Sequence, residues 1–325
     1  MATAVLLKLL AMGLIVALGW GAARLRWLGP GDVARTLSNA AFYLFVPALL
    51  FRTASRMDFA AMPWSALAVF FLPVWAMALA VVVWNQRRVA HASPAAPGVR
   101  AMTACFGNSV QLGIPLAASV LGEAGLAIHL TIVSLHALTI LTLMTAQVEL
   151  ALARDRARQG LADGHLGRLL GETARKTVIH PVVLPIILGL LVNASGVGVP
   201  LLLDELLVQL GQAVVPLCLV LIGVSLNQYG FVFTGRGMVA LVACKLLVMP
   251  AVVLVVGHWV FALEALPLTV VVMAAALPAG SNPLLFAQRY RVLEAETTSA
   301  IAMSTIGFLL TAPLWLAVVA WVVGA

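Results

Sequence analysis

Charged residues are scarce in this chain of 325 residues. Asp, Glu, Lys and Arg make up 10% of it, whereas 63% of the residues are hydrophobic, and the mean hydropathy is +1.08. A water-soluble globule of this size needs much more polar surface, so soluble enzymes, secreted scaffolds and nucleic-acid-binding domains are excluded. The composition predicts an integral membrane protein that contacts the lipid bilayer and has no nucleic-acid partner.

Cysteine is also rare. The three cysteines, Cys105, Cys218 and Cys244, lie in apolar stretches without the spacing of metal ligands. We therefore expect no disulfide framework, no metal site and no cofactor. No nucleophile is paired with a base in a recognisable motif, so we do not expect an enzyme, and an intramembrane hydrolase is the disfavoured alternative.

Long apolar runs dominate what remains. Runs of about 18 to 25 residues, bounded by charges or by Gly and Pro, predict ten transmembrane helices. The fold class is therefore an all-α polytopic membrane protein. The predicted spans are 4–23, 33–51, 64–84, 101–121, 125–150, 178–195, 204–226, 238–262, 266–288 and 297–323.

Basic residues are distributed unevenly between alternate loops. With ten spans, fifteen Lys and Arg residues fall on one side of the membrane and three on the other. By the positive-inside rule, the basic side is cytoplasmic and both termini lie outside. The longest connection, residues 154–176, is then a cytoplasmic linker.

Mid-helix prolines recur in the two halves of the chain at similar separations. Five spans in each half give the halves opposite orientations in the membrane, which is the inverted repeat of secondary transporters. The predicted organisation is a first repeat at 1–153, the linker at 154–176 and a second repeat at 177–325. The corresponding prolines are Pro47 with Pro216, Pro73 with Pro250, and Pro115 with Pro283.

Helix-breaking residues interrupt the fourth and ninth spans. A proline deep in the bilayer removes a helical hydrogen bond and exposes backbone groups that need partners. The predicted breaks are at Gly113 and Pro115 in the fourth span, and at Pro278, Gly280 and Pro283 in the ninth.

Each break also starts a half-helix. Pro115 and Pro283 suit the first helical position, and Asn282 suits the N-cap before Pro283. If the two breaks meet, their half-helix N-termini would bind an anion such as a carboxylate through amide donors and helix dipoles. The alternative is a pair of ordinary kinks stabilised by neighbouring helices, with Asn108 and Gln111 joining helices.

The residues around the breaks resemble the auxin efflux carrier family, which includes bacterial malonate-type carriers and lies within the bile acid:sodium symporter-like superfamily. The matching segments are Gly107-Asn108-Ser109 through Gly113-Ile114-Pro115-Leu116, and Leu277-Pro278 through Pro283-Leu284-Leu285-Phe286-Ala287 with Tyr290.

This resemblance implies a scaffold of spans 1, 2, 6 and 7, which would also form a homodimer interface, and a mobile transport domain of spans 3–5 and 8–10. It implies that helices 4 and 9 cross near the midplane beside the substrate, in an elevator-like cycle. It also implies a bacterial inner membrane as the location.

The same resemblance assigns substrate binding. Asn108 would bind the substrate carboxylate, and Asn193 would supply a second polar contact. We therefore predict a secondary active transporter of a small organic anion, a mono- or dicarboxylate. The predicted substrate-binding set is Asn108, Ser109, Gln111, Gly113, Ile114, Pro115, Asn193, Ser281, Asn282 and Pro283.

Two alternatives stay open at this point. A sodium-coupled symporter of the bile-acid type would find oxygen ligands in backbone carbonyls at the breaks and in Gln111, Ser281 and Asn282. A membrane sensor would bind a ligand without moving it. No acidic residue falls at the middle of a span, which argues against the carboxylate pair of a sodium/proton antiporter.

Two titratable residues are expected deep in the spans and are candidates for ion coupling to H⁺ or Na⁺. His136 either titrates during transport or is a neutral histidine bonded to a facing helix. Lys245 must snorkel, pair or face a cavity, where it would attract an anion or couple transport.

Overall fold

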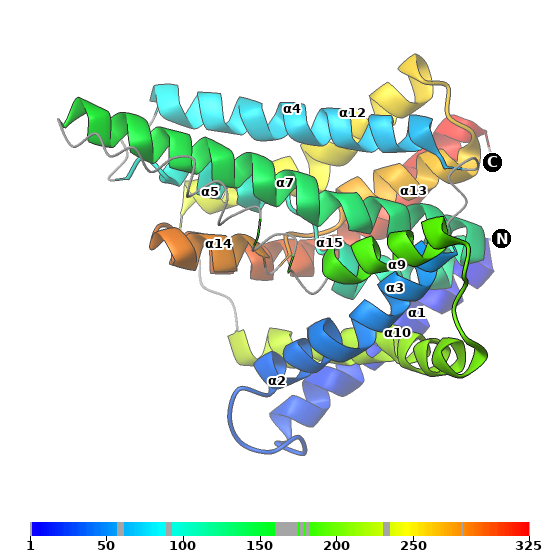
Figure 1. Cartoon of the computed structure of the whole chain (residues 1–325). Coiled ribbons are helices and arrows are strands. Elements are labelled where there is room, and N and C mark those ends of the chain that lie inside the picture. The colour runs from blue at the N-terminus through cyan, green and yellow to red at the C-terminus, as the bar shows by residue number, and fades with distance from the viewer. Residues whose placement is uncertain are drawn as a thin grey trace. The chain divides into compact units, whose positions relative to one another are not determined.

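The computed structural model describes residues 2–56, 62–88, 93–159, 175, 179, 183–229, 235–280 and 282–324. Nearly all of this described chain is helical, and its extended pairing is an isolated bridge between Gly107 and Ala279 (Figure 1). An all-helical architecture is therefore confirmed for the described residues.

Six helical stretches in the described chain are long and apolar enough to cross a membrane. They are Val33–Ser55, Trp64–Gln86, Ser109–Arg156, Leu201–Gln228, Arg236–Val260 and Glu294–Val323. Gly13–Arg24, Leu184–Ser195 and Ala265–Ala276 are shorter apolar helices. The protein is thus a multi-pass membrane protein, and the ten-span inverted repeat stays a prediction.

The chain divides into two compact units, each built from separate parts of the sequence. Unit 1 consists of Met1–Pro63, Ser109–Ser134 and His180–Gly230, and unit 2 consists of Trp64–Asn108, Leu135–Ile179 and Phe231–Ala325. Most of the predicted linker 154–176 lies outside the described residues.

Unit 1 is held together by two helix pairs. α1 (Ala2–Arg24) packs on α10 (Leu201–Tyr229), and α3 (Val46–Ser55) packs on α9 (Val183–Ser195). α2 (Val33–Ala40) also packs on α10, and Gln228 accepts a hydrogen bond from the backbone of Ala34 at 2.8 Å. This unit also contains α6 (Ile114–Leu116), the first turns of α7 (Gly122–Arg158) and the π-helical turns Ala41–Phe45, Ser109–Gly113 and Ala117–Leu121.

Glycines allow α1 and α10 to approach closely. A Cβ atom on Gly19 would overlap the backbone of Val220, and one on Gly223 would overlap the backbone of Val16. Small residues at such positions let helix backbones pack directly against each other, which is the usual basis of helix association in membranes.

Unit 2 is built around α13 (Ala265–Ala276), whose residues from 270 to 276 are all buried. α13 contacts α4 (Trp64–Arg88), α12 (Met249–Val255) and α15 (Glu294–Val323). The unit is completed by α5 (Ala96–Cys105), α11 (Arg236–Ala243), α14 (Asn282–Tyr290) and the later turns of α7.

Three prolines follow wide helical turns. Pro47, Pro115 and Pro250 each occupy the second position of an α-helical stretch preceded by a five-residue π-helical turn. A wider turn gives the carbonyl before a proline room that an α-turn would not provide. Pro73 and Pro216, the predicted counterparts of Pro250 and Pro47, instead lie inside continuous α-helices. The prolines matched by sequence therefore differ in local structure.

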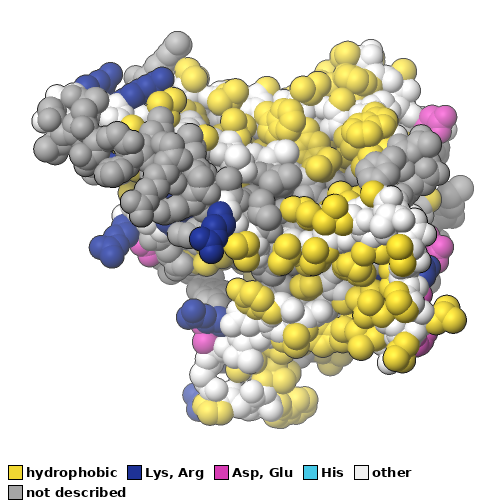
Figure 2. Space-filling model, viewed as in Figure 1, with side chains coloured by type: hydrophobic (Ala, Val, Ile, Leu, Met, Phe, Trp, Pro, Cys, Tyr) yellow, Lys and Arg dark blue, Asp and Glu magenta, His cyan; other side chains and the backbone are white. Residues whose placement is uncertain are grey.

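Large hydrophobic side chains are exposed on helices of both units. Leu72, Leu79 and Trp84 are exposed on α4, and Leu201 and Leu202 are exposed at the start of α10. Figure 2 shows many hydrophobic side chains on the visible surface. This distribution suits helices whose outer faces contact lipid.

Candidate functional site

The breaks in the fourth and ninth helical segments meet within unit 2. α5 ends at Cys105 and α13 at Ala276, and the chain after each helix is extended. The N–H of Asn108 donates to the carbonyl of Pro278 at 2.7 Å, and the N–H of Gly280 donates to the carbonyl of Phe106 at 3.0 Å. These two reciprocal bonds form an antiparallel bridge. We call residues 106–108 and 277–280 the crossing.

The break in the fourth segment lies earlier than the sequence predicted. Gly113 and Pro115 are not in a break but in helical turns, and Gly113 has φ −67° and ψ −45°. The π-helical turn Ser109–Gly113 accommodates Pro115 without interrupting the helix. The actual break is at residues 106–108 and thus includes Asn108.

The break in the ninth segment contains Pro278 and Gly280, as predicted, but not Pro283, which lies in α14. Pro278 and Gly280 are in the extended segment, and Pro283 follows Asn282 at the start of α14. Asn282 and Pro283 are the first two described residues of α14, and the N-cap role of Asn282 stays a prediction. Ser281, also predicted here, lies outside the described residues.

Three buried side chains bind backbone groups in the crossing or in the last turn of α13 just before it. His136 Nε2 accepts from the N–H of Gly107 at 3.3 Å, and Ser304 Oγ accepts from the N–H of Ala279 at 3.1 Å. Lys245 Nζ donates to the carbonyl oxygen of Ala275 at 2.6 Å. Irregular backbone inside a membrane protein requires such partners, because no water is available in the hydrocarbon to replace them.

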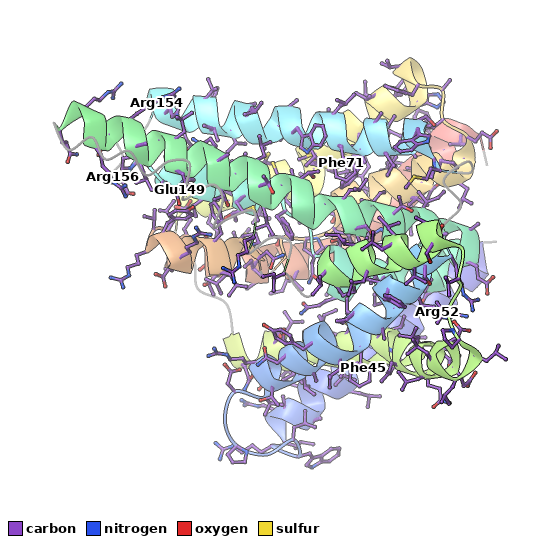
Figure 3. All side chains as sticks on the ribbon, in the orientation of Figure 1. Phe45, Arg52, Phe71, Glu149, Arg154 and Arg156 are labelled. Carbon is purple, nitrogen blue, oxygen red and sulfur yellow. The ribbon has the colours of Figure 1, made fainter. Side chains whose placement is uncertain are left out.

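His136 is enclosed by aromatic rings. Its ring centroid lies 4.7 Å from that of Phe106, 5.5 Å from that of Phe70 and 6.4 Å from that of Phe71. Phe71, labelled in Figure 3, is on α4. Because Nε2 accepts a hydrogen bond, the neutral ring carries its proton on Nδ1. This geometry matches a neutral histidine bonded to a neighbouring segment, and a role in proton coupling stays a prediction.

The predicted binding residues are divided between the two units. Unit 2 contains Asn108, Asn282 and Pro283, and the two asparagines are half-buried. The remaining described residues of the predicted set belong to unit 1, namely Ser109, Gln111, Gly113, Ile114, Pro115 and Asn193.

Two of the unit 1 residues have defined backbone partners. The carbonyl of Ser109 accepts a hydrogen bond from His129 Nε2 at 2.8 Å. Asn193 Nδ2 donates to the carbonyl of Ala54 at 3.4 Å, which joins α9 to α3.

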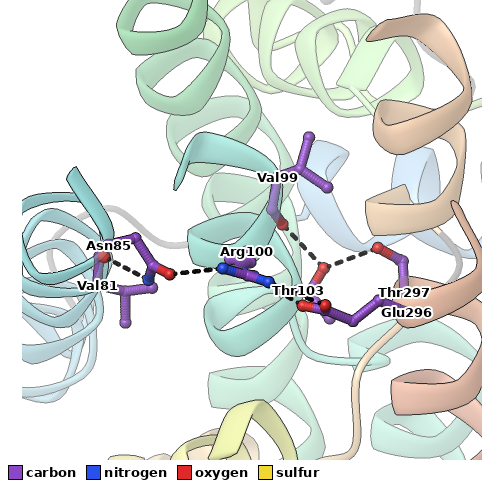
Figure 4. A network of polar contacts seen from close by, with 7 residues as sticks. All are labelled: Val81, Asn85, Val99, Arg100, Thr103, Glu296 and Thr297. Atoms are coloured by element: carbon purple, nitrogen blue, oxygen red, sulfur yellow. Dashed lines mark hydrogen bonds and ion pairs between the residues drawn. The ribbon is translucent and has the colours of Figure 1, made fainter. Parts of the chain in front are cut away.

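A polar network that the sequence did not predict connects three helices of unit 2 (Figure 4). Arg100 on α5 forms two bonds to the carboxylate of Glu296 on α15, at 2.8 and 3.0 Å, and a third to Asn85 Oδ1 on α4 at 3.0 Å. Thr103 and Thr297 share a further bond at 3.3 Å. Nothing in the local sequence indicates the partner of Arg100.

A second network connects α7 with α14. Tyr290 donates its hydroxyl to Glu149 Oε1 at 2.8 Å, and the guanidinium of Arg289 lies 3.8 Å from the same oxygen. Glu149 is near the end of α7 that carries Arg154 and Arg156 (Figure 3). Tyr290 lies beyond the predicted ninth span, and burial together with the Glu149 carboxylate raises the pKa of its phenol above the usual range. The phenol therefore remains a donor at neutral pH.

Comparison with known proteins identifies the family. The sequence profile described as membrane transport protein matches residues 4–316. The chain belongs to this family. The resemblance to auxin efflux carriers, inferred from the two proline-containing segments, is thereby confirmed.

Two relatives are similar to this membrane transport protein. The uncharacterised transporter YfdV of Escherichia coli (strain K12) is 29% identical over 137 residues, which is 42% of this chain and 43% of YfdV. A protein of Rhizobium meliloti (strain 1021) named "Putative malonate transporter" is 26% identical over 285 residues, 85% of this chain and 84% of that protein. The matched region thus spans less than half of YfdV but most of the second relative.

Proposed function

We propose that this transporter carries a small organic anion, a mono- or dicarboxylate, and that the anion binds beside the crossing. The observation that carries the proposal is the reciprocal pairing of residues 106–108 with residues 278–280 in unit 2. The name of the Rhizobium meliloti relative, which includes malonate, supports the carboxylate class.

The chemistry of the crossing suits a carboxylate. α14 begins at Asn282, directly after the crossing, and its first turn has backbone N–H groups without partners inside the helix. Pro283 is tolerated in this turn because the N–H that it lacks would have no partner inside the helix. The side-chain amide of Asn108, next to the bridge, supplies N–H donors of the kind that carboxylate oxygens accept. Donors and a helix dipole would thus hold one negative charge.

Alternating access would follow the elevator scheme. In this proposal, spans 3–5 and 8–10 carry the crossing and the anion, whereas spans 1, 2, 6 and 7 remain fixed in a homodimer in the bacterial inner membrane, with both termini outside. This division differs from that of the two compact units, because residues 109–134, which belong to spans 4 and 5, are part of unit 1. The membrane potential would favour export of an anion, by about 2.3 kcal/mol per charge and 100 mV.

The test is charge movement by the purified protein in liposomes on a solid-supported membrane. Malonate, other dicarboxylates, monocarboxylates, indole acids and bile acids would be compared with and without sodium. We expect a current for one carboxylate class, which Asn108→Ala abolishes although the variant remains folded. Asn227→Ala, at the end of α10 in unit 1, is the matched control and should keep the wild-type current.

A sensor would give a different result. Ligand-dependent thermal stabilisation without current and without exchange of radiolabelled ligand would contradict the transport proposal. A wild-type current that Asn108→Ala leaves unchanged would contradict the proposed site but not the transport of carboxylates.

A further inference from the structure

The side-chain amine of Lys245 lies deep inside unit 2. It lies in the π-helical turn Cys244–Val248, and its relative exposure is 2%. Among the described residues, none of the Asp and Glu carboxylates lies within ion-pair distance of its Nζ, and its hydrogen bond goes to the carbonyl of Ala275. Because burying an ammonium without compensation is costly, Lys245 keeps its charge there only if its surroundings supply negative potential in another form.

The ends of two helices supply that potential. Ala275 is in the last turn of α13, and α5 ends at Cys105, immediately before the crossing. The π-helical turn that contains Lys245 contacts both helices. The ammonium is also beside Gly107, since it lies 3.5 Å from the place that a Cβ atom on Gly107 would take. Lys245 is therefore bonded to a C-terminal carbonyl of α13 and lies close to Gly107, two residues beyond the end of α5.

The charges of this arrangement balance. The C-terminal end of a helix is equivalent to roughly −0.5 elementary charge, so the two ends together amount to about −1. One monovalent cation neutralises them. Backbone carbonyls of broken helices are also the ligands with which transporters hold sodium, so a site of this kind without a lysine would suit a sodium ion.

We propose that the Lys245 ammonium is a tethered cation that takes the place of a coupling sodium ion at the crossing. The substrate anion then binds to a crossing whose negative helix ends are already neutralised, and transport needs no sodium. This inference rests on the proposed function for its transport readout, but the cation site itself can be tested without any substrate.

The decisive variant is Lys245→Ala, because the truncated atoms from Cγ to Nζ correspond to n-propylammonium. Thermal unfolding of the detergent-purified protein would be measured with n-propylammonium, with sodium and with uncharged 1-propanol. We expect n-propylammonium and sodium to raise the Tm of Lys245→Ala, and to leave the Tm of the wild type and of Lys176→Ala unchanged. A Tm of Lys245→Ala that responds equally to 1-propanol, or to none of the three, would overturn the cation site.

The transport arm uses tracer malonate uptake into proteoliposomes in sodium and in choline media. Wild-type uptake should be the same in both media. Uptake by Lys245→Ala should fall by about tenfold or more in choline and recover in part with sodium or n-propylammonium, because a charge in this dry site strongly affects the energy of the bound anion. Lys245→Met keeps an unbranched apolar stem without the charge and should be equally impaired in choline.

The possible failures are separable. Wild-type uptake that requires sodium, or wild-type rates in Lys245→Met without sodium, would overturn the tethered-cation proposal while leaving the transporter proposal intact. Absence of wild-type uptake for every carboxylate would overturn the proposed function, and the Tm response of Lys245→Ala would still decide the cation site.

Discussion

The backbone of Gly280 lies so close to that of Gly107 that a Cβ atom on Gly280 would be 3.2 Å from the carbonyl oxygen of Gly107. The same Cβ would be 3.3 Å from the Cα atom of Asn108. Both contacts are with backbone, which cannot rotate away as a flexible side chain can. The crossing is therefore packed tightly on the Gly280 side.

Gly280→Ala should separate the two strands of the crossing. The expected cost is about 1–3 kcal/mol of unfolding free energy, as for other overpacked sites, together with reduced carboxylate transport. Gly107→Ala is the comparison, since its Cβ would find ordinary contacts of 3.5 Å. Thermal unfolding and tracer uptake would be measured for both variants. Equal effects of the two substitutions would show that close backbone approach is not what requires Gly280.

Gly19→Ala should weaken the pairing of α1 with α10 in unit 1, because the new methyl group would overlap the backbone of Val220. We expect a loss of about 1–3 kcal/mol. Gly21→Ala is on the same helix, where no atom lies within 4 Å of the new Cβ. That control should be neutral or stabilising by up to about 1 kcal/mol, because alanine favours helix more than glycine. Equal stability of the two variants would refute close packing at Gly19.

The ion pair between Arg100 and Glu296 should be strongly coupled, because its side chains are 17% and 14% exposed. Replacing either residue alone by Met leaves a largely buried charge without its partner, at a cost of about 3–5 kcal/mol. The double variant should recover most of this loss. Chemical unfolding of all four proteins would give the coupling energy.

The control for the Arg100 and Glu296 variants is Asp155→Ala, which removes an exposed hydrogen bond to Gln159 on α7. Its effect should stay within about 0.5 kcal/mol. Single Arg100 and Glu296 variants as stable as the wild type would show that the network in Figure 4 does not hold α5 to α15.

Tyr290→Phe should destabilise unit 2 by about 1–3 kcal/mol, because the Glu149 carboxylate would lose a donor while remaining only 6% exposed. The measurement is the midpoint of thermal or chemical unfolding. Tyr43→Phe is the matched control, since Tyr43 is 66% exposed and should change stability by less than about 0.5 kcal/mol. A similar shift in both variants would contradict the role of the Tyr290 hydroxyl.

The sequence predicted the break in the ninth segment better than that in the fourth. Pro278 and Gly280 are two residues apart in an apolar stretch. The helix does not continue through both of them, so the break lies at these residues. Pro115 is likewise a proline in an apolar span, but it follows a π-helical turn and the helix continues. Single-residue propensities do not distinguish a broken helix from one that continues in this way. The fourth segment breaks instead at Gly107, where the chain pairs with Ala279.

The partners of the crossing could not be predicted from local sequence. His136 and Lys245 were recognised as polar residues at depth, but their hydrogen bonds to Gly107 and Ala275 depend on how separate helices rotate and pack. Ser304 gave no signal, because serine is common in membrane helices and its partner, Ala279, lies on another segment. Composition and periodicity place such residues on a helix but do not determine which neighbour they face.

The bridge between Gly107 and Ala279 also has a genetic consequence. Since each segment supplies hydrogen-bond partners for the other, damage to one is transmitted directly to a segment encoded in the opposite half of the gene. Second-site suppressors of a defect at residues 106–108 should therefore arise at residues 277–280, or at the positions that bond to them, more often than among sequence neighbours. Substitutions in the two segments should therefore be tolerated as pairs rather than independently.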